Sequence, residues 1–211
     1  KDENERSFQE FVKYSHNNKK FKFFKVSRPT PVVNDILFSI GKAHTGKPYV
    51  ILVSFEIRPY QKYRYEKNIT KENLRKWVEQ YDLGQLRESL KSEPIPEIQD
   101  DVLPRVVGLN FQKEVVDYKG NVMLFLYSMW CAKSKRIIQD LRKIALRARK
   151  WGVEIKWVVF EITRNEAKGL KMMQSYPILL LYKKNDKKFP VWYDGVFEER
   201  RLENFSHLVI E

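Results

Sequence analysis

Apolar runs and amphipathic segments alternate through the second half of the chain. Residues 121–128 form an apolar run that is too short to cross a membrane, and they predict a buried strand. Residues 133–151 repeat apolar side chains at helical spacing and predict a long helix. The other predicted elements are strands at 105–109, 154–163 and 178–184, a hairpin partner at 191–194, and helices at 110–118, 165–174 and 198–210. This order predicts a mixed sheet with helices on both faces, a three-layer α/β sandwich.

The first half of the chain contains shorter apolar segments. Residues 7–16 place apolar side chains on one helical face, and Ser7 is predicted to be the N-cap. The other predicted elements are strands at 21–26 and 49–55, a hairpin partner at 63–67, and helices at 32–40 and 70–81. Residues 91–101 are polar and contain two prolines, a composition typical of an interdomain linker. We therefore expect two domains.

Composition supports globular domains and limits the classes of partner. The 211 residues are 43% hydrophobic, which is sufficient for real cores, and no apolar run reaches the length of a membrane span. The net charge of +13 would favour an acidic protein partner, a membrane surface or nucleic acid. The 40 Lys and Arg residues are scattered, however, so a solvated basic surface is the main interpretation and nucleic acid is not expected.

Cys131 is the only cysteine, which excludes an intramolecular disulfide and a cysteine-rich zinc site. It falls at a predicted strand-to-helix junction. There the helix macrodipole, free backbone N–H groups and the charges of Lys133, Lys135 and Arg136 would favour the thiolate. The alternative is a small buried apolar residue, which is the commonest state of a free cysteine.

Residues 127–135 read Tyr-Ser-Met-Trp-Cys-Ala-Lys-Ser-Lys. They resemble the segment Tyr-Ala-Pro-Trp-Cys-Gly-His-Cys-Lys at the active site of the protein disulfide isomerases, a family of the thioredoxin superfamily. Tyr176-Pro177 resembles the cis-proline pair that lies against the active-site cysteine in that fold. The resemblance implies that Trp130, Tyr176 and Pro177 contact substrate.

Residues 91–97 and 106–111 resemble the junction between the noncatalytic third domain and the catalytic fourth domain of these isomerases. The resemblance implies two thioredoxin-like α/β sandwich domains, at 1–93 and 105–211, joined by a linker at 94–104. The first domain would carry its own cis-proline at Lys47-Pro48, and it lacks the usual opening strand, helix and central strand. We therefore expect it to be incomplete at its N-terminus.

The same resemblance implies a surface for unfolded client proteins in the first domain. Residues expected on this surface are Phe24, Ile36, Phe38 and Ile40. The alternative is that these side chains form ordinary core.

The departures from the family pattern change the expected chemistry. Ser134 stands where relatives carry the second, resolving cysteine, so Cys131 and Ser134 form the candidate catalytic pair. Cys131 could attack a client disulfide, but nothing in the motif could release the product. Met129 replaces the usual proline and Lys133 the usual histidine. The carboxylate that relatives bury on the strand before the motif has no clear counterpart in the apolar run Val122 to Leu126.

Three functions remain open. The first is a single-thiol protein that captures or retains clients through mixed disulfides. The second is a competent disulfide isomerase or oxidoreductase in which Ser134 replaces a cysteine, or of which this chain is one part. The third is a redox-inert, basic thioredoxin-fold adaptor that binds an acidic partner.

Other candidate sites have weaker support. Asn68-Ile69-Thr70 is an N-glycosylation sequon in a predicted exposed turn, and together with the family resemblance it favours the endoplasmic reticulum lumen. A second sequon at Asn204 lies in a predicted helix and is expected to stay unmodified. Glu161 is interpreted as a polar residue at the end of a strand. The three histidines have no metal-ligand spacing, and no cofactor or metal is expected. The histidines are His16, His44 and His207.

Overall fold

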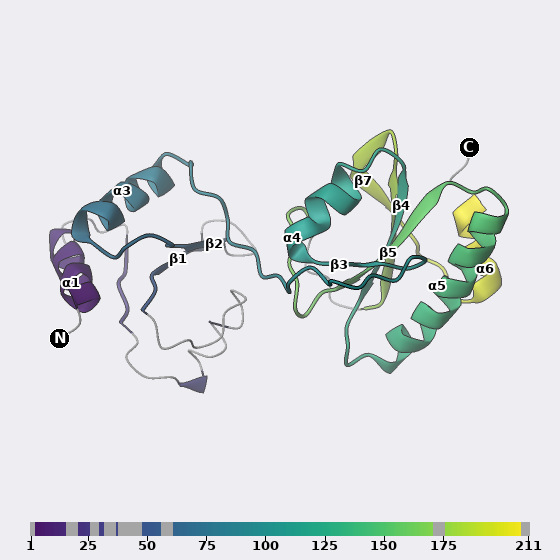
Figure 1. Cartoon of the computed structure of the whole chain (residues 1–211), viewed down its shortest axis with the longest axis horizontal. Coiled ribbons are helices and arrows are strands. Elements are labelled where there is room, and N and C mark those ends of the chain that lie inside the picture. Colours follow the sequence, from purple (N-terminus) through teal and green to yellow (C-terminus); the bar gives the residue numbers. More distant parts are fainter. Residues whose placement is uncertain are drawn as a thin grey trace. The chain divides into compact units, whose positions relative to one another are not determined.

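The computed structural model describes residues 3–15, 21–25, 30–31, 37, 48–55, 61–170 and 176–207. The chain divides into two compact units, Lys1–Ser89 and Leu90–Glu211, each shown in Figure 1. The division falls before the predicted end of the first domain at residue 93. The reason is that Lys91, Ser92 and Glu93 hydrogen-bond to later residues of the second unit.

The first unit pairs two helices with a short antiparallel hairpin. Its elements are α1 (Glu3–Ser15), β1 (Ile51–Ser54), β2 (Gln61–Arg64) and α3 (Lys71–Asp82). The strands pair from Ile51 opposite Arg64 to Ser54 opposite Gln61, as the predicted hairpin requires. Thr70 caps α3, because its hydroxyl oxygen accepts from the backbone N–H of Asn73 at 3.2 Å. The buried core of the unit consists of Phe11, Tyr63, Tyr65, Leu74 and Trp77.

Four predictions for the first unit need correction or cannot be followed. The first helix begins at Glu3 instead of Ser7, and Glu3 and Glu5 place negative charge at its N-terminal turn, which favours the earlier start. Residues 21–25 form no strand. There Phe23 instead packs its ring edge-on against Phe11, with centroids 5.8 Å apart. The predicted helix at 32–40 lies mostly outside the described residues, and so does the predicted bond Lys47-Pro48.

The second unit is built on a five-stranded mixed sheet in the order β3-β5-β4-β6-β7. The strands β3, β4 and β5 run parallel, whereas β6 and β7 are antiparallel to their neighbours. The elements are β3 (Arg105–Val106), α4 (Gly108–Phe111), η1 (Gln112–Val116), β4 (Asn121–Tyr127), α5 (Ala132–Lys150), β5 (Ile155–Glu161), β6 (Ile178–Lys183), β7 (Asp186–Trp192) and α6 (Glu199–His207). The predicted order of strands and helices is confirmed, apart from the helix at 165–174.

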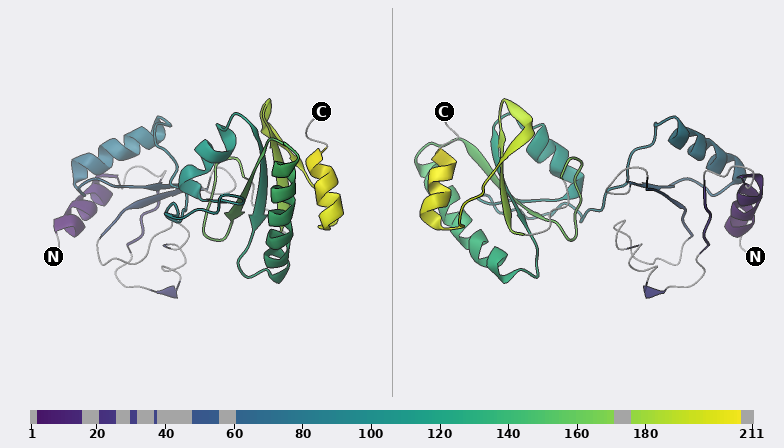
Figure 2. Two further views of the ribbon diagram at one scale, coloured as in Figure 1. Left: turned by 45° about the vertical axis from the view of Figure 1, so that its right-hand side comes forward. Right: turned by 180° about the vertical axis from the view of Figure 1, so that it is seen from behind.

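Alternate side chains of β4 point to opposite faces of the sheet and enter two separate cores. Met123 and Phe125 lie in a core with residues of α5 and α6, whereas Val122 and Leu124 lie in a core with residues of α4 and η1. Figure 2 shows α5 and α6 on one side of the sheet and α4 on the other. The second unit is therefore the three-layer α/β sandwich that the sequence predicts.

The prediction of a helix at 165–174 is wrong for residues 165–170, the part of this range that the structure describes. Residues 165–170 are turns and irregular backbone, and residues 171–174 lie outside the described part of the chain. The side chain of Asn165 binds the backbone of Glu93 and Gly108, and Gly169 has a φ of 86°, a conformation that ends a helix. Tertiary hydrogen bonds therefore override the helical propensity of this segment.

Candidate thiol site at the start of helix α5

The single cysteine lies where the central strand β4 passes into the long helix α5. Cys131 is the N-cap residue of α5, with extended backbone angles, and its N–H donates to the carbonyl of Ser128 at 3.0 Å. Its thiol is free and its side chain is partly exposed. The location matches the prediction, and it excludes the alternative of a buried apolar cysteine.

The surroundings of Cys131 favour its thiolate. The pKa of the Cys131 thiol is lowered, first by hydrogen bonding from the Ser134 hydroxyl and then by the backbone N–H of Ser134. The backbone N–H and the charge of Lys133 lower it further, while partial burial acts in the opposite direction. These causes are those of a thiol at a helix N-terminus, where unpaired N–H groups stabilise negative charge.

Ser134 takes part in this stabilisation from inside the fold. It lies in the first turn of α5, its side chain is fully buried, and its Oγ makes no hydrogen bond of ordinary geometry with any residue in the described ranges. A buried hydroxyl without a partner is costly. Among the described residues the hydroxyl lacks an acceptor while the thiol is protonated, and it can donate to the Cys131 thiolate once the thiol ionises, which is the largest cause of the lowered pKa.

Exposed apolar side chains directly precede the thiol in the chain. Trp130 is 76% exposed and Met129 is 46% exposed, immediately before Cys131. The Tyr176–Pro177 bond is cis, as the resemblance implies, and both residues are half-buried. The next residue, Ile178, pairs with Leu126 of β4, so Pro177 lies beside the end of β4 that leads into residues 128–131. We call residues 128–131 the thiol loop.

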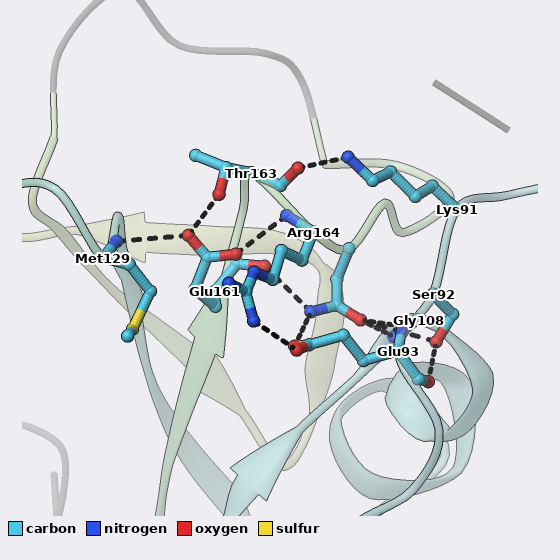
Figure 3. A network of polar contacts seen from close by, with 9 residues as sticks. Lys91, Ser92, Glu93, Gly108, Met129, Glu161, Thr163 and Arg164 are labelled. Atoms are coloured by element: carbon cyan, nitrogen blue, oxygen red, sulfur yellow. Dashed lines mark hydrogen bonds and ion pairs between the residues drawn. The ribbon is translucent and has the colours of Figure 1, made fainter. Parts of the chain in front are cut away.

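A buried carboxylate supports the thiol loop from the neighbouring strand. Glu161, the last residue of β5, is 1% exposed, and its Oε1 accepts from the backbone N–H of Met129 at 3.2 Å. The same oxygen accepts from the Thr163 hydroxyl at 2.6 Å, and Oε2 accepts from the N–H of Arg164 at 2.8 Å (Figure 3). Interpreting Glu161 as a simple strand-end residue missed these contacts. Its only sequence signal is a carboxylate that directly follows a buried apolar run.

Other predicted site residues lie away from the thiol in sequence or outside the described residues. Phe24, in the first unit, is 79% exposed and therefore is not core. Ile36, Phe38 and Ile40 lie outside the described residues. Asn68 is exposed, and its carbonyl accepts from the Tyr65 hydroxyl at 2.8 Å.

The described ranges hold neither a candidate metal site nor a membrane-spanning helix. No group of three or more His, Cys, Asp or Glu side chains there could hold a metal ion. None of the helices found there has the length and apolar character needed to cross a membrane.

The fold and the site together define a thioredoxin-fold domain. The mixed sheet, the cysteine at the start of the helix after β4 and the cis-proline before β6 are its features. In agreement, residues 103–207 match the family model described as Thioredoxin.

Relatives identify the family within this superfamily. The chain is 27% identical over 158 residues to the protein disulfide-isomerase of Humicola insolens, covering 74% of this chain and 31% of that protein. It is 30% identical over 146 residues to protein disulfide isomerase-like 1-5 of Oryza sativa subsp. japonica, covering 69% and 27%. It is 27% identical over 142 residues to human protein disulfide-isomerase A4, covering 66% and 21%.

The chain belongs to the protein disulfide isomerase family of the thioredoxin superfamily. It spans less than a third of the length of each of these three relatives.

Proposed function

We propose that this chain captures disulfide-bearing client proteins through a mixed disulfide at Cys131 that it cannot itself resolve. The observation that carries the proposal is the pair of residues at the start of α5. Cys131 presents a partly exposed thiol with a lowered pKa, and the buried hydroxyl of Ser134 fills the position from which a second thiol would act.

The proposed step is a thiol–disulfide exchange. The Cys131 thiolate attacks one sulfur of a client disulfide, a new S–S bond forms to Cys131, and the other client sulfur leaves as a thiolate that takes a proton from water. The client disulfide is replaced by the mixed disulfide, so no external oxidant or reductant is needed.

Release then depends on the client. The hydroxyl of Ser134 is not acidic enough to attack a disulfide at neutral pH, and a serine cannot form an S–S bond. A second thiolate of the client can attack the mixed disulfide, which returns Cys131 as a thiolate and leaves the client with a different disulfide. The chain would therefore retain clients or shuffle their disulfides, whereas oxidase or reductase turnover is disfavoured.

Apolar surface near the thiol supports binding of unfolded segments. Exposed Trp130 and Met129 precede Cys131, and Tyr176 and Pro177 lie at the end of β4. Side chains of this kind supply contact area without selecting a particular sequence. In the first unit, taken by itself, the exposed ring of Phe24 offers an apolar contact for unfolded segments.

The endoplasmic reticulum lumen is the compartment we propose, because clients there carry disulfides. The exposed sequon at Asn68 fits such a compartment. We expect the chain, expressed through the secretory pathway, to lose mass on treatment with an N-glycosidase, and Asn68→Gln to abolish that loss. A chain whose mass does not change, or whose change persists in Asn68→Gln, would contradict glycosylation of Asn68.

The capture itself is tested with a protein whose disulfides have been scrambled. After incubation and acid quenching, mass spectrometry should find client joined to Cys131, and Cys131→Ser should form no adduct. Ser134→Cys should shorten the life of the adduct, because it supplies the missing resolving thiol.

The alternatives predict different results. Multiple turnovers by the unmodified chain, without an accumulating adduct, would favour a competent isomerase. A Cys131 thiol of ordinary pKa that forms no adduct would favour the redox-inert adaptor.

A further inference from the structure

Asn165 joins three segments of the second unit through a buried side chain. It is 2% exposed, and its Oδ1 accepts from the N–H of Glu93 at 2.9 Å, from the N–H of Gly108 at 3.1 Å and from the Ser92 hydroxyl at 3.4 Å. Its Nδ2 donates to the carboxylate of Glu93 and to the carbonyl of Glu161, both at 3.0 Å. The hydrogen-bonding capacity of the amide is therefore used within the fold.

Through Glu93 and Glu161, Asn165 connects the first residues of the second unit to the thiol loop. Glu93 lies close to the first residue of the unit, Leu90, and Glu161 holds the N–H of Met129, two residues before Cys131. The contacts run from Glu93 to Asn165, from Asn165 to the main-chain carbonyl of Glu161, and from the Glu161 carboxylate to the N–H of Met129. Figure 3 shows Glu161 with its bond to Met129, and Glu93 nearby.

Lys91 makes a second connection in parallel with the first. Its backbone N–H donates to the Glu166 carboxylate at 2.9 Å, and its carbonyl accepts from the Glu166 N–H at 2.8 Å. Its ammonium group donates to the carbonyl of Thr163, whose hydroxyl in turn donates to the carboxylate of Glu161. Residues 91–93 are thus linked to Glu161 at two points, through Asn165 to its main-chain carbonyl and through Thr163 to its carboxylate.

The contacts leave little room for adjustment. Lys91 and Glu161 are 7% and 1% exposed, so water cannot easily replace a lost partner. At Gly108 an added Cβ would lie 2.7 Å from the carbonyl oxygen of Glu166 and 2.8 Å from that of Lys91. In such a packed polar network the position of one member fixes the position of the next.

We propose that Asn165 is a positioning residue that couples the entering segment, residues 91–93, to the thiol loop around Cys131. The proposal rests on the proposed function, because it concerns how the attacking thiol is held. A displacement of residues 91–93 changes the support of Met129 and, through it, the alignment of Cys131 with the N–H groups and the hydroxyl that stabilise its thiolate.

The first experiment measures the pH dependence of Cys131 alkylation by iodoacetamide in the full chain and in Asn165→Ala. This substitution is uncharged, so it alters the thiol only through structure. The thiol pKa should rise by about 0.5 unit or more, roughly a threefold shift of the thiol–thiolate equilibrium.

Asn110→Ala is the matched control. The Asn110 side chain accepts from the N–H of Val107 at 2.8 Å, close to Gly108, but it has no bond to the carboxylate of Glu93 or to Glu161. It should leave the thiol pKa unchanged. A folded Asn165→Ala with the alkylation profile of the unsubstituted chain would overturn the coupling.

A second experiment needs no variant and decides the question if Asn165→Ala does not fold. Coupling between two sites is reciprocal, so alkylating Cys131 should loosen the other end of the network. Amide hydrogen exchange at Glu93 and Gly108 should become at least about twofold faster in the alkylated chain, with Val107 as the unchanged reference. Equal exchange rates before and after alkylation would contradict the proposal.

The outcomes separate this inference from the proposed function. If Cys131 of the unsubstituted chain has an ordinary pKa and forms no mixed disulfide, the proposed function fails. If Cys131 is acidic and forms the adduct, but neither measurement responds as described, only the role of Asn165 fails.

Discussion

The hydroxyl of Ser134 has two opposite effects on the chemistry of Cys131. As a hydrogen-bond donor it lowers the pKa of the thiol and so raises the fraction of attacking thiolate at neutral pH. As an alcohol it cannot attack the mixed disulfide that results. In the proposed capture, this single residue would therefore favour formation of the adduct and remove the internal route for its release.

The donor role predicts a measurable change in Ser134→Ala. The thiol pKa of Cys131 should rise by about 0.5–1 unit, because a hydrogen bond to a charged group contributes about 1.5–3 kcal/mol and the thiol is partly exposed to screening water. Alkylation at pH 7 should slow, while the rate well above the thiol pKa should remain the same.

Ser128→Ala provides the matched comparison for that experiment. Ser128 is also fully buried, and its Oγ likewise has no hydrogen-bond partner among the described residues, but its hydroxyl is not among the causes of the pKa shift at Cys131. In the Ser128→Ala variant, Cys131 should be alkylated with the same pH dependence as in the unsubstituted chain. An equal shift in both variants would assign the effect to general loosening of the fold.

At the scale of single residues, the sequence pattern was sufficient to predict the position of the thiol but not the role of the buried Glu161 carboxylate. The spacing from Trp130 to Ser134 and the Tyr176-Pro177 pair were sufficient to predict the thiol's position and the cis bond. Glu161 was interpreted as a strand-end residue because its partner Met129 lies 32 positions earlier in the chain. Contacts at such separation follow from strand pairing, which local patterns do not specify.

At the scale of elements, the turn into α4 controls how residues 91–93 pack. Gly108 is its first residue, and a Cβ there would meet two backbone oxygens that belong to fixed segments. Only a residue without a side chain allows this close approach.

Gly108→Ala should therefore destabilise the second unit by about 2–3 kcal/mol, a typical cost of overpacking against atoms that cannot move freely. Gly152→Ala is the control, since its Cβ would meet nothing within 4 Å and only its φ of 70° opposes the change, at about 1 kcal/mol. Urea unfolding measures both. If Gly108→Ala lowers the free energy of unfolding by no more than Gly152→Ala does, the packing argument is contradicted.

Strongly periodic elements were predictable, and elements decided by tertiary contacts were not. The short apolar run that forms β4 and the amphipathic repeat of α5 both fold as their patterns predict. The segment after β5 has helical composition, yet the amide of Asn165 binds two backbone N–H groups from distant segments and holds residues 165–170 in an irregular path. The strand predicted at 105–109 is likewise cut short where Gly108 begins α4.

At the scale of the whole molecule, a basic globular chain carries a single thiol, for which we propose binding of a client without release. The net charge of +13 comes from Lys and Arg residues scattered along the chain, so it indicates no particular site. The specific chemistry comes from the short loop between β4 and α5, and from the buried contacts that hold it.

The most direct measurement of that chemistry is the reaction of the full chain with excess 5,5′-dithiobis(2-nitrobenzoate), a small aromatic disulfide. We predict that each chain releases one thionitrobenzoate and keeps a second one bound to Cys131 as a stable adduct, visible in the intact mass. In Ser134→Cys the new thiol should expel the bound group, so that two are released and no adduct remains. Loss of the adduct from the unsubstituted chain, or failure of Cys131 to react, would contradict a thiol that captures without resolving.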